Sequence, residues 1–254
     1  MHTNWRVFPI ALMAAALLAP CALAAADDDV HRERREQLVE SLTRSGFFGL
    51  GRQAIEDETV LDAMRAVERH RFVQLAHVPR AYEDTPLPIG HGQTISQPYI
   101  VAFMTELLQV EEDDVVLEIG AGSGYQAAVL AEIVDHVYTI EIIEPLGRQC
   151  AERMEELDYG NVTVSVGDGY YGWEEHAPFD AIIVTAAASH IPPPLVEQLK
   201  PGGRMVIPVG PPFGGQNLMV VEKDEEGTVT QRSVMPVRFV PLTRGEANGD
   251  GDGA

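Results

Sequence analysis

The stretch Val115-Val-Leu-Glu-Ile-Gly-Ala-Gly-Ser-Gly-Tyr-Gln126 decides the fold of this chain. It opens with a run of apolar and β-branched residues, which predicts a buried parallel strand. Three glycines follow at positions 120, 122 and 124, and residues 125–134 then predict a helix. Glycines allow a sharp turn and the close approach of a ligand, and a helix start offers free N–H groups. The stretch therefore predicts a strand, a turn suited to binding and a helix.

The spacing of the glycines indicates which ligand the turn suits. G-x-G-x-G differs from the G-x-G-x-x-G that binds a dinucleotide pyrophosphate. Glu118 lies two places before the first glycine, where its carboxylate could pair with a cationic amino-acid group. A turn that serves only tight strand–helix packing is the alternative. The pattern resembles the first motif of class I methyltransferases, which implies that S-adenosylmethionine is bound by Glu118, Gly120, Gly122 and Gly124.

Acidic residues follow the next two predicted strands. Residues 136–142 predict a strand with Glu141 near its end, where a doubly wound fold places an acid that holds both ribose hydroxyls. Residues 161–166 predict a third strand, followed by Asp168 and Gly169. Asp168 would accept a hydrogen bond from the exocyclic amine of adenine, with Gly169 in the same site. Asp168 alone could be a turn residue between glycines, but the series of strand ends favours the ligand role.

The composition bounds the class of protein. The chain has 254 residues, of which 45% are hydrophobic, enough for one α/β domain with additions. A net charge of −21 leaves no basic footprint for a nucleic acid, so none is expected as a partner. The eight histidines are scattered without H-x-x-x-H or C-x-x-C spacing, so no metal site is expected. The acidity fits a high-salt habitat or simple solubility and defines no function.

A second informative stretch is Leu87-Pro-Ile-Gly-His-Gly-Gln-Thr-Ile-Ser-Gln-Pro98, which leads into a predicted helix over residues 99–108. Its hydroxyls could cap that helix and its last proline suits a first turn, but capping does not require the whole string. Together with the glycine motif, the string resembles the protein-L-isoaspartate O-methyltransferases. Similar segments lie at 66–73, 178–187 and 237–242, and the resemblance covers roughly residues 35–245.

The resemblance implies methyl transfer from S-adenosylmethionine to the free carboxylate of L-isoaspartyl residues in damaged proteins and peptides. Ser96 matches the family's active-site serine and would hold that carboxylate. The residues that would shape the peptide groove are Ile89, Gly90, Thr94, Val237 and Phe239. Two alternatives remain open: a small-molecule carboxyl methyltransferase on the same fold, and a non-catalytic exported protein that binds S-adenosylmethionine.

We expect an α/β fold, a doubly wound, Rossmann-like class I methyltransferase sheet in a single domain. N-terminal helices and a substrate loop would occupy residues 27–98, the cofactor-binding core 99–210, an antiparallel strand pair 211–244 and an acidic tail 245–254. Helices are predicted at 30–46, ending at a glycine, and at 57–68. His70 is expected at the surface, and the protein is expected to be a monomer.

Residues 1–26 stand apart from the rest. Arg6 is their only charged side chain, and the apolar run 7–19 is short for a membrane span. An A-x-A pattern ends at Ala24, and Ala26 offers a second cleavage site. These features predict a secretory signal peptide and a periplasmic protein, although the family is usually cytoplasmic, which is the alternative. After cleavage Cys150 would be the only cysteine, so no intrachain disulfide is possible.

Overall fold

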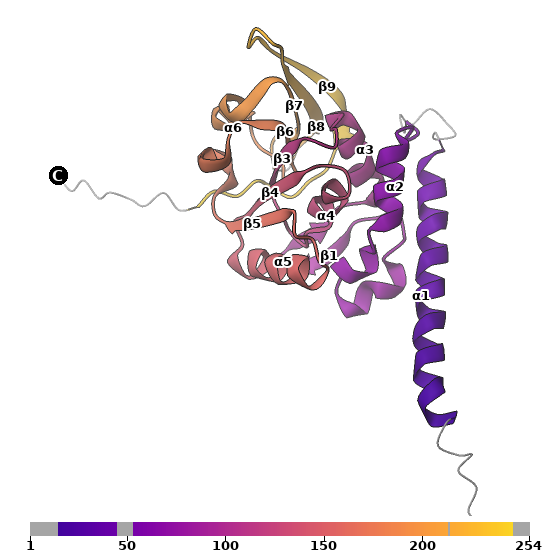
Figure 1. The fold of residues 1–254 in the computed structure, drawn as a ribbon. Helices are drawn as coiled ribbons and strands as arrows, with labels where there is room; N and C mark the ends of the chain where they lie inside the picture. The colour runs from indigo at the N-terminus through magenta and orange to yellow at the C-terminus, as the bar shows by residue number, and fades with distance from the viewer. Residues whose placement is uncertain (1–14, 45–52, 213, 246–254) are drawn as a thin grey trace, which may run out of the picture.

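The computed structural model describes residues 15–44, 53–212 and 214–245 (Figure 1). A seven-stranded sheet forms the centre, in the order β5-β4-β3-β6-β7-β8-β9. Its strands are β3 (Val115–Ile119), β4 (His136–Glu141), β5 (Val162–Val166), β6 (Phe179–Val184), β7 (Leu199–Val209), β8 (Gln216–Lys223) and β9 (Val229–Val237). The helices are α1 (Ala15–Leu42), α2 (Glu58–Ala66), α3 (Pro98–Leu108), α4 (Tyr125–Ala131), α5 (Glu144–Glu156) and α6 (Pro193–Gln198).

The strand order confirms the doubly wound α/β fold. From β3 the chain moves outward to β4 and β5, then returns to pair β6 with the other side of β3. These strands and β7 are parallel, whereas β8 and β9 form the predicted antiparallel pair at the C-terminal edge. The reversal of direction between β3 and β6 leaves a crevice at their carboxyl ends, which is where such folds bind ligands.

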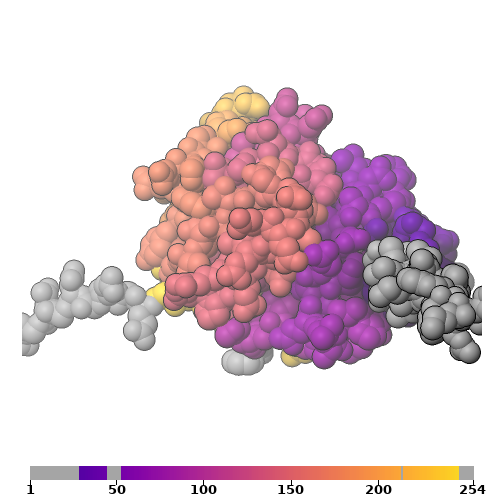
Figure 2. Space-filling model, turned by 60° about the horizontal axis from the view of Figure 1, so that its bottom comes forward, coloured from indigo at the N-terminus to yellow at the C-terminus, as the bar shows by residue number. Residues whose placement is uncertain are grey.

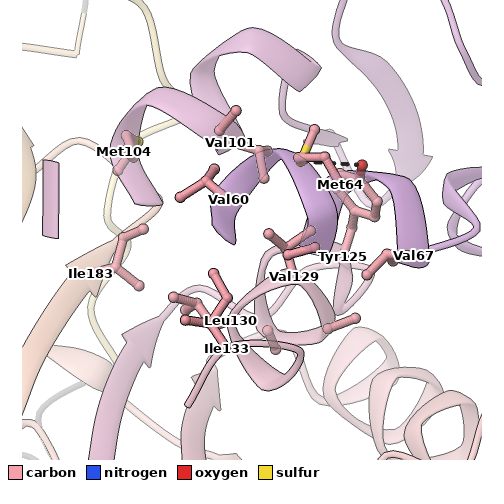
Figure 3. Packing of buried hydrophobic residues seen from close by; sticks show 14 of the residues in the cluster. Val60, Met64, Val67, Val101, Met104, Tyr125, Val129, Leu130, Ile133 and Ile183 are labelled. Carbon is pink, nitrogen blue, oxygen red and sulfur yellow. Dashed lines mark hydrogen bonds between the residues drawn. The ribbon is translucent and has the colours of Figure 1, made fainter. Parts of the chain in front are cut away.

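Both faces of the sheet are buried. Successive residues of a strand point to opposite faces of the sheet. Val116 faces a core shared with α2, α3, α4 and α5, while its neighbour Leu117 faces a second core under α6. Figure 3 shows the first core, where Met64, Val101 and Val129 from three helices pack together. Burial on both faces explains why these strands are continuous apolar runs in the sequence.

Helix α2 follows its sequence pattern closely. Asp57 accepts hydrogen bonds from the N–H groups of Thr59 and Val60, which caps the helix at its first turn. The apolar residues at helical spacing within the predicted range 57–68 are all buried: Val60, Leu61, Met64 and Val67. The helix therefore packs against α1, α3 and α4 through the side predicted from its periodicity.

Helix α1 differs from the predicted range 30–46. It begins at Ala15 and ends at Leu42, and Gly46 lies outside the described residues. The run Ala-Leu-Ala-Ala-Ala at 22–26 has high helix propensity, so no stop separates it from the residues that follow. Leu38, Val39 and Leu42 are buried against the body. The helix stands along one side of the molecule, and its N-terminal part extends beyond the body (Figure 1).

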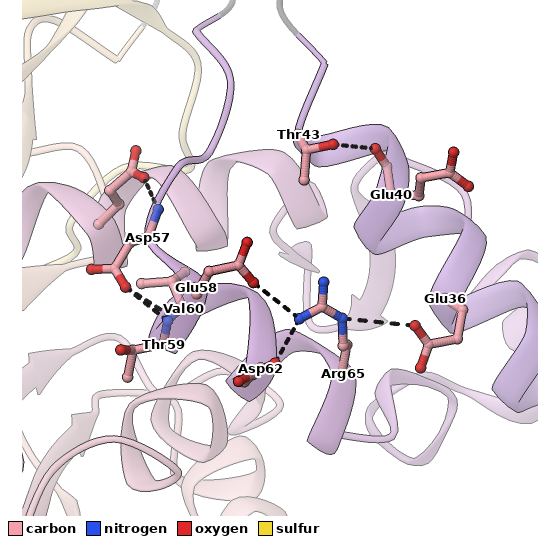
Figure 4. A network of polar contacts seen from close by, with 10 residues as sticks. Glu36, Glu40, Thr43, Asp57, Glu58, Thr59, Val60, Asp62 and Arg65 are labelled. Carbon is pink, nitrogen blue, oxygen red and sulfur yellow. Dashed lines mark hydrogen bonds and ion pairs between the residues drawn. The ribbon is translucent and has the colours of Figure 1, made fainter.

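An ion-pair network joins α1 to α2 (Figure 4). Arg65 of α2 lies 2.6 Å from Asp62 and 3.6 Å from Glu58 on its own helix, and 3.7 Å from Glu36 on α1. In the space-filling view of Figure 2, the N-terminal residues in purple form one side of the body beside the pink and orange sheet region. Of the helices described, none combines the length and apolarity that a bilayer span requires.

The predicted substrate loop contains two short strands. β1 (Leu87–Gly90) and β2 (Gln93–Ile95) form an antiparallel hairpin separate from the main sheet. Two 3-10 helices precede it, η2 (Arg69–Phe72) and η3 (Leu75–Arg80). Gly90 and Gly92 have φ angles of +100° and +73°, in the left-handed region that favours glycine at a tight reversal. The hairpin thus delivers the segment with Ser96 to the start of α3.

Candidate active site

Two hollows meet at the carboxyl ends of the parallel strands. The inner cavity lies at the β3–β6 crevice, and its lining includes Ser96, Glu118, Gly120, Gly122, Glu141, Gly169, Thr185 and residues 240–243. The outer groove lies beside it, and its lining includes Thr94, Ser96, Tyr99, Thr185 and residues 235–240. They share four residues: Thr94, Ser96, Thr185 and Val240. A molecule in the inner cavity would therefore meet one in the outer groove at these side chains.

The glycine turn forms the floor of the inner cavity. Gly120 and Gly122 have φ angles of +103° and +53°. A Cβ at Gly120 would lie 2.5 Å from the Thr185 hydroxyl oxygen, so a larger residue cannot replace it without displacement. Gly124 is not among the lining residues, and a Cβ there would lie 2.8 Å from the Cys150 sulfur. The first two glycines thus line the cavity, and the third lets α4 pack against α5.

Glu141 at the end of β4 orders this turn. Its Oε2 accepts a 2.7 Å hydrogen bond from the Gly122 N–H, and its Oε1 accepts one of 2.9 Å from Ile143. The side chain is buried and lines the inner cavity. A carboxylate has about four lone-pair sites, so two remain for a ligand's hydroxyl groups.

Glu118 in β3 is buried completely, and one of its oxygens lacks a partner. Oε2 accepts a hydrogen bond from the Thr139 hydroxyl, while Oε1 has no partner among the described residues. Burial raises the pKa of this carboxyl to about 8; the Thr139 hydrogen bond opposes the shift and the charge of Glu141 adds to it. A cationic group bound in the cavity would satisfy Oε1 and favour the ionised form.

Asp168 binds the C-terminal segment of the chain. Its Oδ1 accepts a hydrogen bond from the Tyr170 N–H, and its Oδ2 accepts 3.0 Å bonds from Arg244 Nε and the Gly245 N–H. Burial opposes ionisation, but these hydrogen bonds outweigh it and hold the pKa of Asp168 below its ordinary value. Gly169 lines the inner cavity directly, whereas Asp168 does not.

Ser96 does not cap α3. The N-cap residue is Gln97, which makes no side-chain capping bond, and Pro98 occupies the first turn as its sequence position predicts. The capping role considered for the Ser96 hydroxyl is therefore wrong, because the helix starts one residue too late for it. The Ser96 hydroxyl has no hydrogen-bond partner within the described part of the chain and faces both hollows.

The other residues predicted to shape the peptide groove divide into two sets. Thr94, Val237 and Phe239 line the outer groove. Ile89 and Gly90 line neither hollow. Ile89 lies behind the glycine turn, since a Cβ at Gly122 would be 3.3 Å from its Cδ1.

Sequence reasoning missed two residues that shape the site. The Thr185 hydroxyl donates to the carbonyls of Ile119 and Gly120 and so ties β6 to the glycine turn. Arg69 is fully buried and donates a 2.9 Å hydrogen bond to the carbonyl of Ser96. Thr185 directly follows a strand, so the strand-end rule could have found it. Arg69 lies in a polar segment whose sequence carries no sign of burial.

Metal-ligating side chains do not gather in this region. Within residues 15–44, 53–212 and 214–245, no three His, Cys, Asp or Glu side chains are placed to hold a metal ion together.

Comparison with known proteins assigns the family. The family model described as protein-L-isoaspartate(D-aspartate) O-methyltransferase matches residues 33–247. The chain belongs to this family. A protein-L-isoaspartate O-methyltransferase 1 of Cupriavidus necator is 58% identical over 238 residues, which are 93% of this chain and 92% of that protein. A protein-L-isoaspartate O-methyltransferase 2 of a Polaromonas species is 62% identical over 81% of this chain and 97% of that protein.

Solved structures of protein-L-isoaspartate O-methyltransferases share the fold. One superposes with a TM-score of 0.73 at 27% identity, covering 82% of this chain and 66% of that one. Another, a putative member from Plasmodium falciparum in complex with S-adenosyl-L-homocysteine, gives 0.69 at 25% identity over 85% of this chain and 99% of that one. These likenesses confirm the predicted methyltransferase fold.

The inner cavity fits the cofactor of a protein-L-isoaspartate O-methyltransferase. S-adenosylmethionine carries an ammonium group, and Glu118 offers a buried carboxyl oxygen without a partner. It carries two ribose hydroxyls, and Glu141 presents a carboxylate to the cavity. Gly120 and Gly122 line the same cavity, and the Gly122 N–H is held by Glu141.

Proposed function

We propose that this protein transfers a methyl group from S-adenosylmethionine to the free carboxylate of L-isoaspartyl residues in damaged proteins and peptides. The observation that carries the proposal is the junction of the two hollows at Ser96, Thr94, Thr185 and Val240. One hollow presents acids suited to a cationic nucleoside, and the other is an open groove beside β9 suited to an extended peptide. Methyl transfer requires the two substrates to meet at such a point.

We assign the residues in and around the inner cavity to parts of the cofactor. Glu118 binds the ammonium group, and Glu141 binds the ribose hydroxyls while it holds the turn. Gly120 and Gly122 allow the backbone to lie close to the ligand, with Gly124 as the packing residue behind them. Gly169 and Asp168 lie at the adenine end.

Ser96 is the residue that we assign to the substrate carboxylate. When bound, S-adenosylmethionine supplies a methyl group that its positive sulfur already activates. The isoaspartyl carboxylate is ionised at neutral pH, so the chain needs no general base. The Thr185 hydroxyl already donates to backbone carbonyls, whereas that of Ser96 is available to orient the carboxylate oxygen. A neutral donor holds the nucleophile without neutralising its charge.

The product is suited to repair. The methoxy group of a methyl ester leaves more readily than the oxygen of a carboxylate. The next backbone nitrogen of the substrate can therefore attack the ester carbonyl, close a succinimide ring and release methanol. Hydrolysis of that ring returns some normal aspartate.

A methylation assay on matched peptides tests the function. One peptide contains L-isoaspartate and its control contains L-aspartate in the same sequence; small carboxylic acids form a third set. We expect methyl transfer to the first peptide and a background rate on the others. Turnover of small acids alone would indicate a small-molecule enzyme, and cofactor binding without any transfer would indicate a binding protein.

We also propose that the protein is exported and acts as a monomer. The apolar run 7–19 and the A-x-A pattern that ends at Ala24 support export to the periplasm. Analytical ultracentrifugation should give a single species, lighter than the 27.7 kDa of the full chain by the mass of the 24 or 26 residues removed.

A further inference from the structure

The segment after β9 forms one wall of the inner cavity. Residues 240–245, here called the C-terminal strap, follow the outer groove and pass along the carboxyl edge of the sheet. The first end of the strap is fixed beside β6: the Ala187 N–H donates to the Val240 carbonyl and the Leu242 N–H donates to the Ala187 carbonyl, both at 2.8 Å. Residues 240–243 then line the inner cavity.

The second end of the strap is fixed beyond β5. Arg244 and the Gly245 N–H both bond Asp168 Oδ2, and Arg244 also donates a 2.9 Å bond to the Tyr171 hydroxyl. The guanidinium carbon lies 3.6 Å from the centre of the Tyr170 ring. Because β3 and β4 lie between β6 and β5 in the sheet, the strap crosses the ends of the strands that carry Glu118 and Glu141. In Figure 1 the yellow segment runs toward β5, away from α1.

The two ends differ in strength. The end at Ala187 consists of backbone hydrogen bonds at a buried residue. At the other end the Arg244 side chain is 44% exposed, so solvent and salt weaken its ion pair with Asp168. The strap is therefore hinged at Ala187 and can be released at Arg244.

We propose that Arg244 is a positioning residue that latches the strap over the inner cavity and so governs how S-adenosylmethionine and its product enter and leave. This inference rests on the proposed cofactor site. When the Arg244–Asp168 ion pair is formed, the strap closes the cavity at the β5 side. With the latch broken, residues 243–245 are free to swing about the attachment of residues 240–242 at Ala187.

The test measures cofactor exchange directly. The probe is S-adenosylhomocysteine, and its association and dissociation rates are followed by stopped-flow fluorescence on the full chain. Loss of one exposed ion pair and one cation–π contact should speed dissociation roughly tenfold in Arg244→Gln, without slowing association. Arg244→Lys keeps the charge and should restore most of the slow dissociation. Raised salt should speed dissociation in the wild type but not in Arg244→Gln.

Arg232→Gln is the matched control. Arg232 is an exposed arginine on β9, lines neither hollow and has no ion pair within the described residues. Its variant should exchange the probe at the wild-type rates.

In steady-state assays Arg244→Gln should raise the KM for S-adenosylmethionine and leave the KM for the peptide unchanged.

Two results would overturn the latch. One is a folded Arg244→Gln protein with wild-type exchange rates; the other is a Lys variant no better than Gln. A tail with a purely structural role would lower the melting temperature without changing the exchange rates. Failure of the wild-type protein to bind the probe at all would instead contradict the proposed function, so the two failures are distinguishable.

Discussion

The Ser96 hydroxyl belongs to a residue that lines both hollows, and it makes no hydrogen bond to the described residues. Because it caps nothing, Ser96→Ala should change the free energy of unfolding by no more than about 0.5 kcal/mol. Loss of the bond that orients the substrate carboxylate should lower kcat roughly tenfold or more, with cofactor affinity nearly unchanged. Turnover of isoaspartyl peptide, calorimetric binding and denaturant unfolding measure the three quantities.

The matched control for this serine lies on α1. The Ser41 hydroxyl donates to the Leu38 carbonyl, far from both hollows, so Ser41→Ala should keep the wild-type kcat. A Ser96→Ala enzyme that turns over as fast as the control would remove Ser96 from catalysis.

We expect Glu118 to make cofactor binding depend on pH. Its pKa of about 8 leaves it protonated near neutral pH before a ligand binds. A bound ammonium group favours the carboxylate, so binding should release up to about one proton and tighten as the pH rises toward 8. Calorimetry of S-adenosylhomocysteine binding in buffers of different ionisation enthalpy measures that proton. Glu118→Gln should bind more weakly and release none; equal release from the wild type and this variant would refute the role.

The same carboxyl contributes to stability with a definite sign. The folded pKa, about 8, lies above the ordinary value of 4.5 for a glutamate, so between them the folded state holds more protons than the unfolded state. The contribution is therefore complete below pH 4.5 and is lost as the pH rises through 8. Urea unfolding of the ligand-free protein should show this decline, and Glu118→Gln should flatten it.

Residues that follow strands could be predicted from the sequence, and residues that pair over long distances could not. Glu118, Gly120, Gly122 and Glu141 all line the inner cavity, because strand ends converge at one edge of a parallel sheet. The contact of Asp168 with Arg244 joins positions 76 residues apart, and neither local pattern signals the other. Their roles toward the cofactor remain predictions.

At the scale of elements, Arg69 holds the hairpin segment in place. It donates to the carbonyls of Ala81, Thr85 and Ser96 from a fully buried position. Arg69→Met keeps the apolar stem but leaves these carbonyls without their donor, which should cost about 3 kcal/mol or more of stability. The displaced Ser96 backbone should also raise the KM for peptide at temperatures where the variant is folded.

Arg71→Met is the comparison for this change. Arg71 lies two residues away, is partly exposed and pairs with Glu156 at the surface, so its loss should cost at most about 1 kcal/mol. Equal destabilisation of the two variants in denaturant titrations would show that burial of Arg69 is not what matters.

Elements whose apolar residues recur at regular spacing could be predicted from the sequence. Very short strands, and residues that contact distant parts of the chain, could not. The range of α2 was close because its apolar residues recur at helical spacing. β1 and β2 were expected as loop, because two strands of three or four residues with proline and glycine show no alternation. His70 was expected at the surface and is half-buried: its ring stacks 4.2 Å from that of His31 on α1, and its Nδ1 lies 2.7 Å from the Tyr82 hydroxyl.

At the scale of the whole molecule, the doubly wound fold followed from one stretch, because a buried strand that turns through glycines into a helix implies a parallel neighbour. Alternating strands and helices then extended the sheet, and the C-terminal strands closed it. Which cavity each loop would line depended on the strand order, which no single stretch contains.

The attachment of α1 to the rest of the protein bears on the predicted signal peptide, residues 1–26. The contacts between α1 and the body that the structure describes include the His31 stack, the Arg35–Glu68 pair and the buried residues 38, 39 and 42. Cleavage after Ala24 or Ala26 would leave all of them. A protein beginning at Asp27 should therefore match the full chain in unfolding free energy, to within about 0.5 kcal/mol, and in kcat.

Mass spectrometry of protein from its native cells should find an N-terminus near Ala25 or Asp27 in the periplasmic fraction. Intact Met1 recovered from the cytoplasm would refute export, and a destabilised Asp27 form would show that the first 26 residues belong to the folded domain.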